Sequence, residues 1–373
     1  MIYLDSAATT LQKPPAVGRA MAAAVGSCAS PGRAGHQAAR RAEQAVYACR
    51  ELAAELFGAS PEGVIFTMNA THGLNLAIKS LVEPGDRVVI SGFEHNAVTR
   101  PLHALGARVA VAGKKLFDPR DTVRDFQAQV TEDTRAVVCT LSSNVFGYVL
   151  PVDRIAQVCR ARGVPLIVDA SQGAGVLPVS LEGWGAAFVA MPGHKGLYGP
   201  QGTGLLLCAD GQPVRSLLQG GTGSQSISQD MPGFLPDRLE AGTHNVPGIC
   251  GLYQGLRFIQ RRTPEAILGH ERRLIRALAR GLERMPGLRY WYGGEDCQAG
   301  VLSLCARDVD CEELADRLDR RGVAVRAGLH CAPLAHENAG TLETGTVRLS
   351  VSAFNTPGEI AQALEAVQDS LNG

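Results

Sequence analysis

Residues 191–204 read MPGHKGLYGPQGTG, and the organisation of the chain follows from this stretch. It holds seven glycines and prolines around one lysine, Lys195, and apolar runs flank it at residues 186–190 and 205–207. The pattern predicts a strand, a tight irregular loop and a second strand, because glycine and proline favour turns. Glycine also lets the backbone of such a loop pass close to a bound group. Taken alone, the pattern fits equally well a hairpin that carries one surface lysine.

A carboxylate upstream favours a functional role for this lysine. Residues 166–172 read LIVDASQ, in which three apolar residues precede Asp169. We expect a buried parallel strand with Asp169 at its carboxyl end, where open α/β sheets bind ligands. A lysine in a partly dry pocket can lose its proton and form a Schiff base with an aldehyde. Asp169 and Lys195 together predict a site for pyridoxal phosphate, in which the aspartate keeps the pyridine nitrogen protonated.

Further motifs extend this pattern over nearly the whole chain. They are LDSAAT at 4–9, DASQ at 169–172, GHKGLYGP at 193–200, RAGLHCA at 326–332 and VRLSVSAFNT at 347–356. With them the chain resembles the class-V aminotransferases, and within these the cysteine desulfurases and selenocysteine lyases. RAGLHCA is similar to the RxGHHCA signature of the group II desulfurases. The resemblance implies a pyridoxal-phosphate-dependent transferase of fold type I that converts L-cysteine to L-alanine.

Composition limits the class of protein and its partners. The chain has 373 residues with 36 basic and 36 acidic side chains, which gives no electrostatic reason to expect nucleic acid or an anionic membrane. We see neither a run of about 18 apolar residues, as a membrane span requires, nor the blocks of a signal peptide. The ten cysteines lack the paired spacing of a zinc site. We therefore expect a cytoplasmic protein without a metal.

Strands and helices are predicted to alternate along the first part of the chain. The predicted strands cover residues 64–67, 87–91, 108–112, 136–141, 166–169, 186–190 and 205–207. The predicted helices cover residues 35–57, 121–130 and 151–163, and another begins after residue 69. This βαβα order predicts an α/β fold with a mostly parallel sheet and helices on both faces. The resemblance implies seven strands in that sheet.

After residue 207 the pattern changes. Residues 219–244 are rich in glycine, serine and proline and predict an irregular loop. Helices at 247–260, 264–285, 311–321 and from 357 then accompany short strands at 288–292, 301–305, 323–326 and 347–351. We expect a large pyridoxal-phosphate-binding domain at residues 15–245. A small α+β C-terminal domain at residues 246–373 would include the N-terminal segment 1–14.

The resemblance assigns contacts to the cofactor. It places Ala70 and Thr71 at the phosphate, where a polar turn opens a helix whose free N–H groups suit an anion. On its own, Thr71 fits an ordinary helix N-cap. His95 corresponds to a histidine that stacks on the pyridine ring and takes part in proton transfer, although a lone histidine after a strand is often a surface group. The remaining implied contacts are Asn144, near the phenolic oxygen, with Asp169, Gln172, His194 and Lys195.

One more implied contact comes from a second subunit. Residues 239–245 read LEAGTHN, which is similar to the family's EAGTPN. In that family the threonine reaches the phosphate of the neighbouring subunit. The resemblance therefore implies a homodimer with shared active sites, in which Thr243 completes the partner's site. His244 replaces the family's proline.

A desulfurase needs a thiol that attacks the sulfur of its substrate. The resemblance implies that Cys331 is this nucleophile, because it lies in the polar, glycine-bordered stretch 326–332, and most of the other cysteines are expected in the core. We expect a loop there, so that Cys331 can approach and leave the cofactor. A nearby cation lowers the pKa of a thiol, and Arg326 and His330 are the candidates for it.

Arg348 is the implied partner of the substrate's carboxylate. It begins an apolar strand, and a guanidinium can grip a carboxylate with two parallel hydrogen bonds. An arginine at a strand end on the surface is the alternative. Arg326 and Asn144 complete the implied substrate site, and the implied catalytic residues are Lys195, Cys331 and His95.

Three positions depart from the family's pattern. Leu329 stands where the first signature histidine would be, Pro192 replaces a serine that contacts phosphate, and His72 replaces a glutamate. These departures leave open whether L-cysteine or L-selenocysteine is the substrate and which protein accepts the sulfur. The alternatives to a desulfurase are a selenocysteine lyase, another class-V reaction such as epimerisation or β-elimination, and a sulfur-relay protein without turnover.

Overall fold

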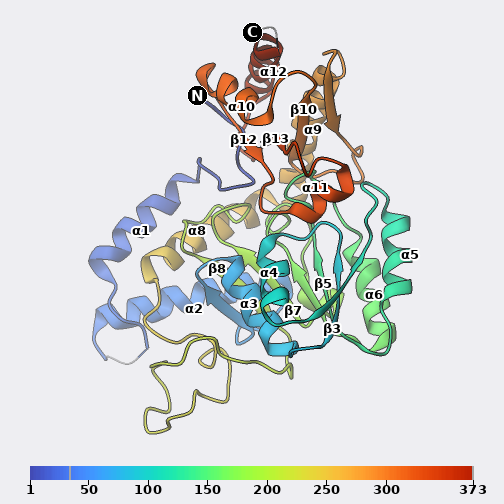
Figure 1. Cartoon of the computed structure of the whole chain (residues 1–373). Helices are drawn as coiled ribbons and strands as arrows, with labels where there is room; N and C mark the ends of the chain where they lie inside the picture. The colour runs from blue at the N-terminus through green and yellow to red at the C-terminus, as the bar shows by residue number, and fades with distance from the viewer. Residues whose placement is uncertain (33–34, 372–373) are drawn as a thin grey trace.

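A seven-stranded sheet forms the centre of the larger part of the molecule in the computed structural model, which describes residues 1–32 and 35–371 (Figure 1). Its spatial order is β2-β8-β7-β6-β5-β3-β4. The strands are β2 (Val64–Thr67), β3 (Arg87–Ser91), β4 (Arg108–Ala112), β5 (Thr134–Thr140), β6 (Leu166–Asp169), β7 (Phe188–Pro192) and β8 (Gly204–Cys208). Only β8 runs against its neighbours, and the other pairs are parallel. The predicted mostly parallel seven-stranded sheet is confirmed.

Helices cover both faces of this sheet because its central strands are apolar on both sides. Neighbouring residues of β5 show this, since Val137 belongs to one buried cluster and Val138 to the other. On one face lie α2 (Gln37–Phe57), α5 (Pro119–Gln129), α6 (Val152–Arg162) and α8 (Val246–Arg262), and on the other lie α3 (Ala70–Leu81) and α4 (Asn96–Ala104). The predicted helix at 35–57 ends as expected, at Gly58, which adopts the left-handed conformation that favours glycine.

A smaller antiparallel sheet in the order β12-β13-β10-β9 is built from the end of the chain. Its strands are β9 (Leu288–Trp291), β10 (Val301–Ala306), β12 (Arg326–Gly328) and β13 (Thr346–Ser350). They share an apolar core with the helices α9 (Pro264–Leu282), α10 (Cys311–Arg320) and α12 (Pro357–Leu371). Leu4 belongs to this core, which places the beginning of the chain beside the C-terminal helices (Figure 1).

The predicted single strand at residues 323–326 is wrong. β11 (Val323–Ala324) pairs in parallel with β1 (Ile2–Tyr3), whereas β12 begins at Arg326 and pairs with β13. The chain changes partners after two residues because the N-terminal segment offers a second sheet edge, which local sequence does not reveal.

The helix α8 begins at Val246, directly after the predicted domain boundary between residues 245 and 246. It packs against α2 and against α1 (Pro15–Ser27), on the side of the large sheet. The two-domain division at this residue therefore stays a prediction. No helix within residues 1–32 and 35–371 is long and apolar enough to cross a membrane.

The predicted irregular loop is confirmed. Residues 209–245 contain neither helix nor strand and extend away from the body of the molecule, at the lower left of Figure 1. A buried ion pair anchors this segment, because Arg50 in α2 donates two hydrogen bonds to the Glu240 carboxylate, at 2.8 and 3.1 Å. The backbone N–H of Phe66 donates to the same carboxylate at 2.6 Å.

Candidate active site

A cavity of about 210 Å³ opens where the parallel strands β5, β6 and β7 end. All predicted site residues except Thr243 line it, although they come from segments far apart in the sequence. They are Ala70, Thr71, His95, Asn144, Asp169, Gln172, His194, Lys195, Arg326, Cys331 and Arg348. They include one carboxyl side chain, that of Asp169, and three lysine or arginine side chains, those of Lys195, Arg326 and Arg348.

The Lys195 loop joins β7 to β8 and is held closed by its own backbone. Gly199 donates its N–H to the carbonyl oxygen of Gly193 at 2.7 Å. A Cβ at Gly196 would lie 2.3 Å from the carbonyl oxygen of Ala174, so only glycine fits there. The predicted strand, loop and strand are confirmed. Burial lowers the pKa of Lys195 to about 8, an effect that Arg348 and Arg326 strengthen and Asp169 opposes.

Asp169 lies buried at the carboxyl end of β6, as predicted. Its Oδ1 accepts a hydrogen bond from the N–H of Ser171 at 2.9 Å. Behind it lies Glu94, a fully buried residue that the sequence did not single out. Burial raises the pKa of Glu94 to about 8, helped by the charge of Asp169. Glu94 is therefore mostly neutral at pH 7, and Asp169 is the carboxylate of the cavity.

His95 caps α4 and lines the cavity with the rest of its ring. Its Nδ1 accepts a hydrogen bond from the N–H of Ala97 at 3.0 Å, which assigns the proton of the neutral ring to Nε2. Burial lowers the pKa of His95, and the nearby Lys195 lowers it further although Asp169 opposes both. The ring of His95 is thus held in place by its Nδ1, and Nε2 is the nitrogen that carries the exchangeable proton. Its predicted roles, stacking on the cofactor and proton transfer, stay predictions.

The first turn of α3 closes another side of the cavity. Asn69 is the N-cap, because its Oδ1 accepts a hydrogen bond from the N–H of His72 at 3.0 Å. The alternative that Thr71 is the N-cap is therefore wrong. Thr71 is exposed and lines the cavity together with Ala70, at a helix end that suits an anion.

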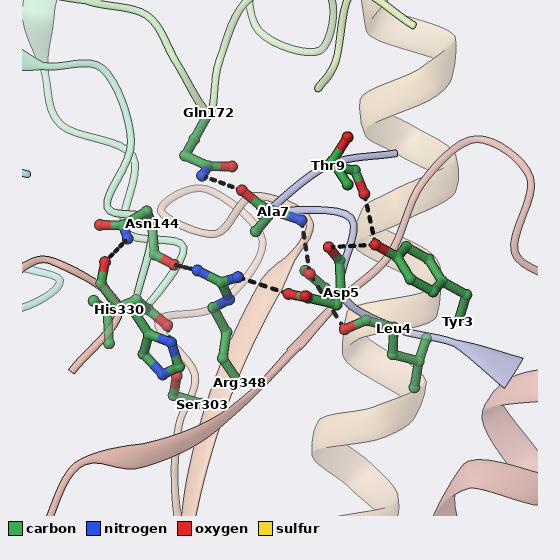
Figure 2. Close-up of polar contacts among 12 residues, drawn as sticks. Tyr3, Leu4, Asp5, Ala7, Thr9, Asn144, Gln172, Ser303, His330 and Arg348 are labelled. Carbon is green, nitrogen blue, oxygen red and sulfur yellow. Dashed lines mark hydrogen bonds and ion pairs between the residues drawn. The ribbon is translucent and has the colours of Figure 1, made fainter. Parts of the chain in front are cut away.

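Arg348 is almost fully buried, with 2% of its side chain exposed, so the surface alternative is excluded. Its Nη2 lies 2.7 Å from Asp5 Oδ1, and its Nη1 donates to the carbonyl oxygen of Asn144 at 3.1 Å (Figure 2). Gln172 donates from Nε2 to the carbonyl oxygen of Ala7 at 2.9 Å, which holds the N-terminal segment at the cavity. Asp5 and Ala7 are therefore held at the site by the side chains of Arg348 and Gln172.

Cys331 occupies a turn between β12 and α11 (Pro333–Ala339), where both His330 and Cys331 have a positive φ, of 50° and 56°. The loop predicted for it is confirmed. All ten cysteines lie in the described residues, and Cys331 is the one classed as exposed. Its carbonyl oxygen accepts a hydrogen bond from the N–H of Asn96 at 2.7 Å.

The proposal that His330 supplies a positive charge to Cys331 is wrong. His330 is 5% exposed, and its Nε2 lies 3.1 Å from the carbonyl oxygen of Thr346. Burial lowers its pKa to about 2, so the ring is neutral. Of the two candidates, this leaves Arg326, which is exposed and lines the same cavity as Cys331.

Thr243 lies outside this cavity. It is exposed on the irregular segment, in a second pocket of about 230 Å³ that it shares with His72, Met68 and Glu240. His72, one of the family departures, therefore belongs to the surroundings of Thr243. Pro192 lines the cavity itself, and Leu329 has 38% of its surface exposed beside Cys331.

The residues present fit pyridoxal phosphate. Four buried polar atoms of residues that line the cavity have no hydrogen-bond partner among the described residues, namely Ser142 Oγ, His194 Nδ1, His330 Nδ1 and Arg348 Nε. Such atoms indicate a polar ligand, because buried polar groups are normally paired. A lysine with a lowered pKa, a buried carboxylate and a helix N-terminus supply the three contacts that the aldehyde, the pyridine nitrogen and the phosphate need. Ser142 escaped the sequence analysis because a serine in a strand-ending SSN has no distinctive pattern.

The fold is that of the type I pyridoxal-phosphate-dependent enzymes. The model of the family "Aminotransferase class-V" matches residues 2–363, and the chain belongs to this family. A "probable cysteine desulfurase" of Methanothermobacter thermautotrophicus is 33% identical over 382 residues, covering 99% of this chain and 94% of that protein. A "probable cysteine desulfurase" of Mycolicibacterium paratuberculosis is 31% identical, covering 99% of this chain and 55% of that longer protein.

A solved structure gives the same result. The apo cysteine desulfurase of Thermococcus onnurineus NA1 superposes with a TM-score of 0.91 at 27% identity, covering 100% of this chain and 95% of that chain. The predicted family is confirmed, and its members named here are cysteine desulfurases. The family implies pyridoxal phosphate as the cofactor.

Proposed function

We propose that this protein is a cysteine desulfurase that converts L-cysteine to L-alanine and retains the sulfur on Cys331. The observation that carries this proposal is the position of Cys331, an exposed thiol in the same cavity as Lys195, Asp169 and Arg348. An exposed thiolate is the form of cysteine that attacks sulfur. A reducing cytoplasm, the compartment we propose, would keep this thiol free.

Pyridoxal phosphate would be held by Lys195 at its aldehyde, by Asp169 at its pyridine nitrogen and by Ala70 and Thr71 at its phosphate. Asn144, Gln172, His194 and the ring of His95 are the other proposed contacts. When bound, the cofactor supplies an aldehyde and a ring that withdraws electrons from the substrate's Cα.

Residues of the chain itself would bind the substrate and transfer protons. Arg348 takes the substrate's carboxylate with its guanidinium, and Arg326 and Asn144 complete the substrate site. Lys195, whose amine is half neutral near pH 8, accepts the Cα proton. His95, held by its Nδ1, moves a proton at Nε2.

Cys331 carries the sulfur transfer. Its thiolate attacks the sulfur of L-cysteine, the substrate's Cβ–S bond breaks, and an S–S bond forms. The electron pair of the Cβ–S bond stays with Cβ, which takes up the thiol proton. The balance is L-cysteine and the Cys331 thiol giving L-alanine and the Cys331 persulfide, so no external oxidant is needed. An acceptor protein would then take the sulfur.

We also propose a homodimer. Thr243 lies on an exposed segment outside its own cavity, which suits a contact to the phosphate of a partner subunit. Sedimentation should show a dimer, and Thr243→Ala should lose cofactor more readily than the unmodified protein. A fully active monomer would contradict the shared site.

Alanine and sulfide measured together after incubation with L-cysteine test the function. Equal amounts of both, in the presence of a reductant that releases the persulfide, would support it, and sulfide without alanine would contradict it. Selenocysteine lyase activity is the second candidate, because Leu329 removes one proton donor beside Cys331. Selenolate leaves more readily, so Cys331→Ala should keep activity on L-selenocysteine and lose it on L-cysteine. A β-lyase would form pyruvate in place of alanine.

A further inference from the structure

The Asp5–Arg348 ion pair has no part in the steps described above, and it lies directly behind the carboxylate site. Asp5 Oδ1 is 2.7 Å from Arg348 Nη2, with 20% of the Asp5 side chain and 2% of the Arg348 side chain exposed (Figure 2). Arg348 lines the cavity and Asp5 does not, so Asp5 contacts the guanidinium from outside the cavity. A ligand carboxylate in the cavity therefore need not displace Asp5.

The backbone fixes Asp5 in this position. Asp5 forms a parallel bridge with Ser350, two residues beyond Arg348 in the same strand. The N–H of Ser350 donates to the carbonyl oxygen of Leu4 at 2.7 Å, and Ser350 Oγ accepts from the N–H of Ala7 at 2.9 Å. The backbone of Asp5 is thus paired with β13, two residues from Arg348. This pairing keeps the Asp5 carboxylate within reach of the guanidinium.

The charges of the cavity show why a carboxylate at this position matters. The cavity has three cations, Lys195, Arg326 and Arg348, and one carboxylate, Asp169. A buried arginine without a counter-charge is costly, so Asp5 stabilises the charged Arg348 while the cavity is empty. The same negative charge repels a carboxylate that approaches Arg348 from the cavity side.

We propose that Asp5 is the permanent counter-ion of Arg348 and sets how tightly the cavity binds the carboxylate of its amino-acid substrate and product. Asp5 keeps the guanidinium charged and oriented, because Nη2 contacts the Asp5 carboxylate while Nη1 donates to the carbonyl oxygen of Asn144. The negative charge of Asp5 also lowers the affinity of Arg348 for the ligand's carboxylate, so that the product can dissociate. This inference rests on the proposed role of Arg348 as the carboxylate partner.

The test is an equilibrium binding measurement on the cofactor-loaded protein, which needs no turnover. The probe is propionate, and propionamide, which has the same shape without the charge, is the control ligand. Asp5→Asn keeps a hydrogen-bond acceptor for Arg348 and removes the charge. Tyr3→Phe is the matched control variant, because the Tyr3 hydroxyl donates only to backbone carbonyl oxygens, of Thr9 at 2.8 Å and of Asp5 at 3.3 Å, and its loss leaves the charge of the Asp5 carboxylate in place.

We expect Asp5→Asn to bind propionate about 10-fold more tightly, because one repelling charge within a few ångströms is gone. Binding of propionamide should not change, and Tyr3→Phe should bind both probes as the unmodified protein does. Asp5→Asn should also have a lower melting temperature than the unmodified protein. Propionate should raise the melting temperature of Asp5→Asn by more than it raises that of the unmodified protein. Unchanged or weaker propionate binding in a folded Asp5→Asn protein would overturn the inference.

Arg348→Ala separates this inference from the proposed function. If Arg348→Ala weakens propionate binding while Asp5→Asn leaves it unchanged, Arg348 binds the carboxylate and only the role of Asp5 is wrong. If Arg348→Ala leaves propionate binding unchanged, the role of Arg348 and the inference built on it are both wrong.

Discussion

The side-chain amide of Asn144 donates a hydrogen bond to the backbone carbonyl oxygen of His330, with 2.7 Å between nitrogen and oxygen (Figure 2). The carbonyl oxygen of Asn144 itself accepts from Arg348 at 3.1 Å. One residue in the loop that follows β5 thus connects the turn that carries Cys331 to the arginine proposed for the substrate's carboxylate.

Asn144→Leu should slow sulfur transfer more than it affects the cofactor. The change keeps the side chain's size and removes the donor that fixes the turn at His330, so Cys331 loses its defined position. We expect a fall of about 10-fold to 100-fold in kcat, as displacement of a reacting group by about 1 Å can cause. The visible absorbance of bound cofactor serves as the control, and a variant with unchanged kcat would contradict this role.

Cys331→Ser should separate binding from sulfur transfer. A hydroxyl has a far higher pKa than a thiol and is a poor nucleophile towards sulfur, so alanine formation from L-cysteine should cease. Since Cys331 is exposed, the melting temperature should change little. Bound cofactor and propionate affinity should match the unmodified protein. Cys305→Ser, at a partly buried thiol of the small sheet, is the matched control and should remain active.

Reloading of the apo-protein with pyridoxal phosphate should depend on pH through Lys195. Only the neutral amine attacks an aldehyde, and burial lowers the pKa of Lys195 to about 8. The rate should therefore rise about tenfold per pH unit below pH 8 and level off above it. The growth of visible absorbance measures this rate, and Lys195→Arg should show none. A rate that does not change between pH 6 and pH 9 would be inconsistent with Lys195 as the attachment point.

Glu240→Gln should destabilise the fold near the irregular segment. Glu240 and Arg50 are 5% and 7% exposed, and removing one partner of a buried pair costs about 3 kcal/mol in unfolding free energy. Chemical denaturation measures the loss. Glu83→Gln removes one partner of the exposed pair with Arg215 and should change little.

The stability that Glu240 contributes should also depend on pH. Burial works to raise the pKa of Glu240, but His244 and Arg50 outweigh it and hold the pKa below its ordinary value of 4.5. A carboxyl with a lowered pKa in the folded state stabilises above its unfolded pKa and loses that contribution as the pH falls through the folded pKa. The difference between the unmodified protein and Glu240→Gln should therefore shrink below about pH 4. A constant difference down to pH 3 would contradict this.

The large sheet, Asp169 and the Lys195 loop could be predicted from the sequence because their signals are local, whereas the other site residues were expected from the family resemblance. Runs such as LIVD at residues 166–169 are apolar on both faces and end in a polar residue, which predicts both the strand and its ligand-binding end. The glycines and prolines around Lys195 likewise predict the loop, because both residue types favour turns.

The features that escaped prediction depend on contacts between distant segments. β1 has two residues and exists only because it pairs with β11, more than 300 residues later. The ion pair of Asp5 with Arg348 has the same origin, since the residue numbers of the partners differ by 343. The neutral state of His330 follows from burial, which a motif does not reveal. The short helix α11 lies beyond Cys331 in a stretch whose few turns give little periodicity.

Mass spectrometry of the unmodified protein after brief incubation with L-cysteine shows whether Cys331 accepts the sulfur. The peptide that contains Cys331 should gain one sulfur atom, in proportion to the alanine released in the first turnover. Treatment with a thiol reductant should remove this sulfur. Alanine formed without any added sulfur on that peptide, or added sulfur on Cys305 or Cys311 in its place, would contradict Cys331 as the sulfur-accepting nucleophile.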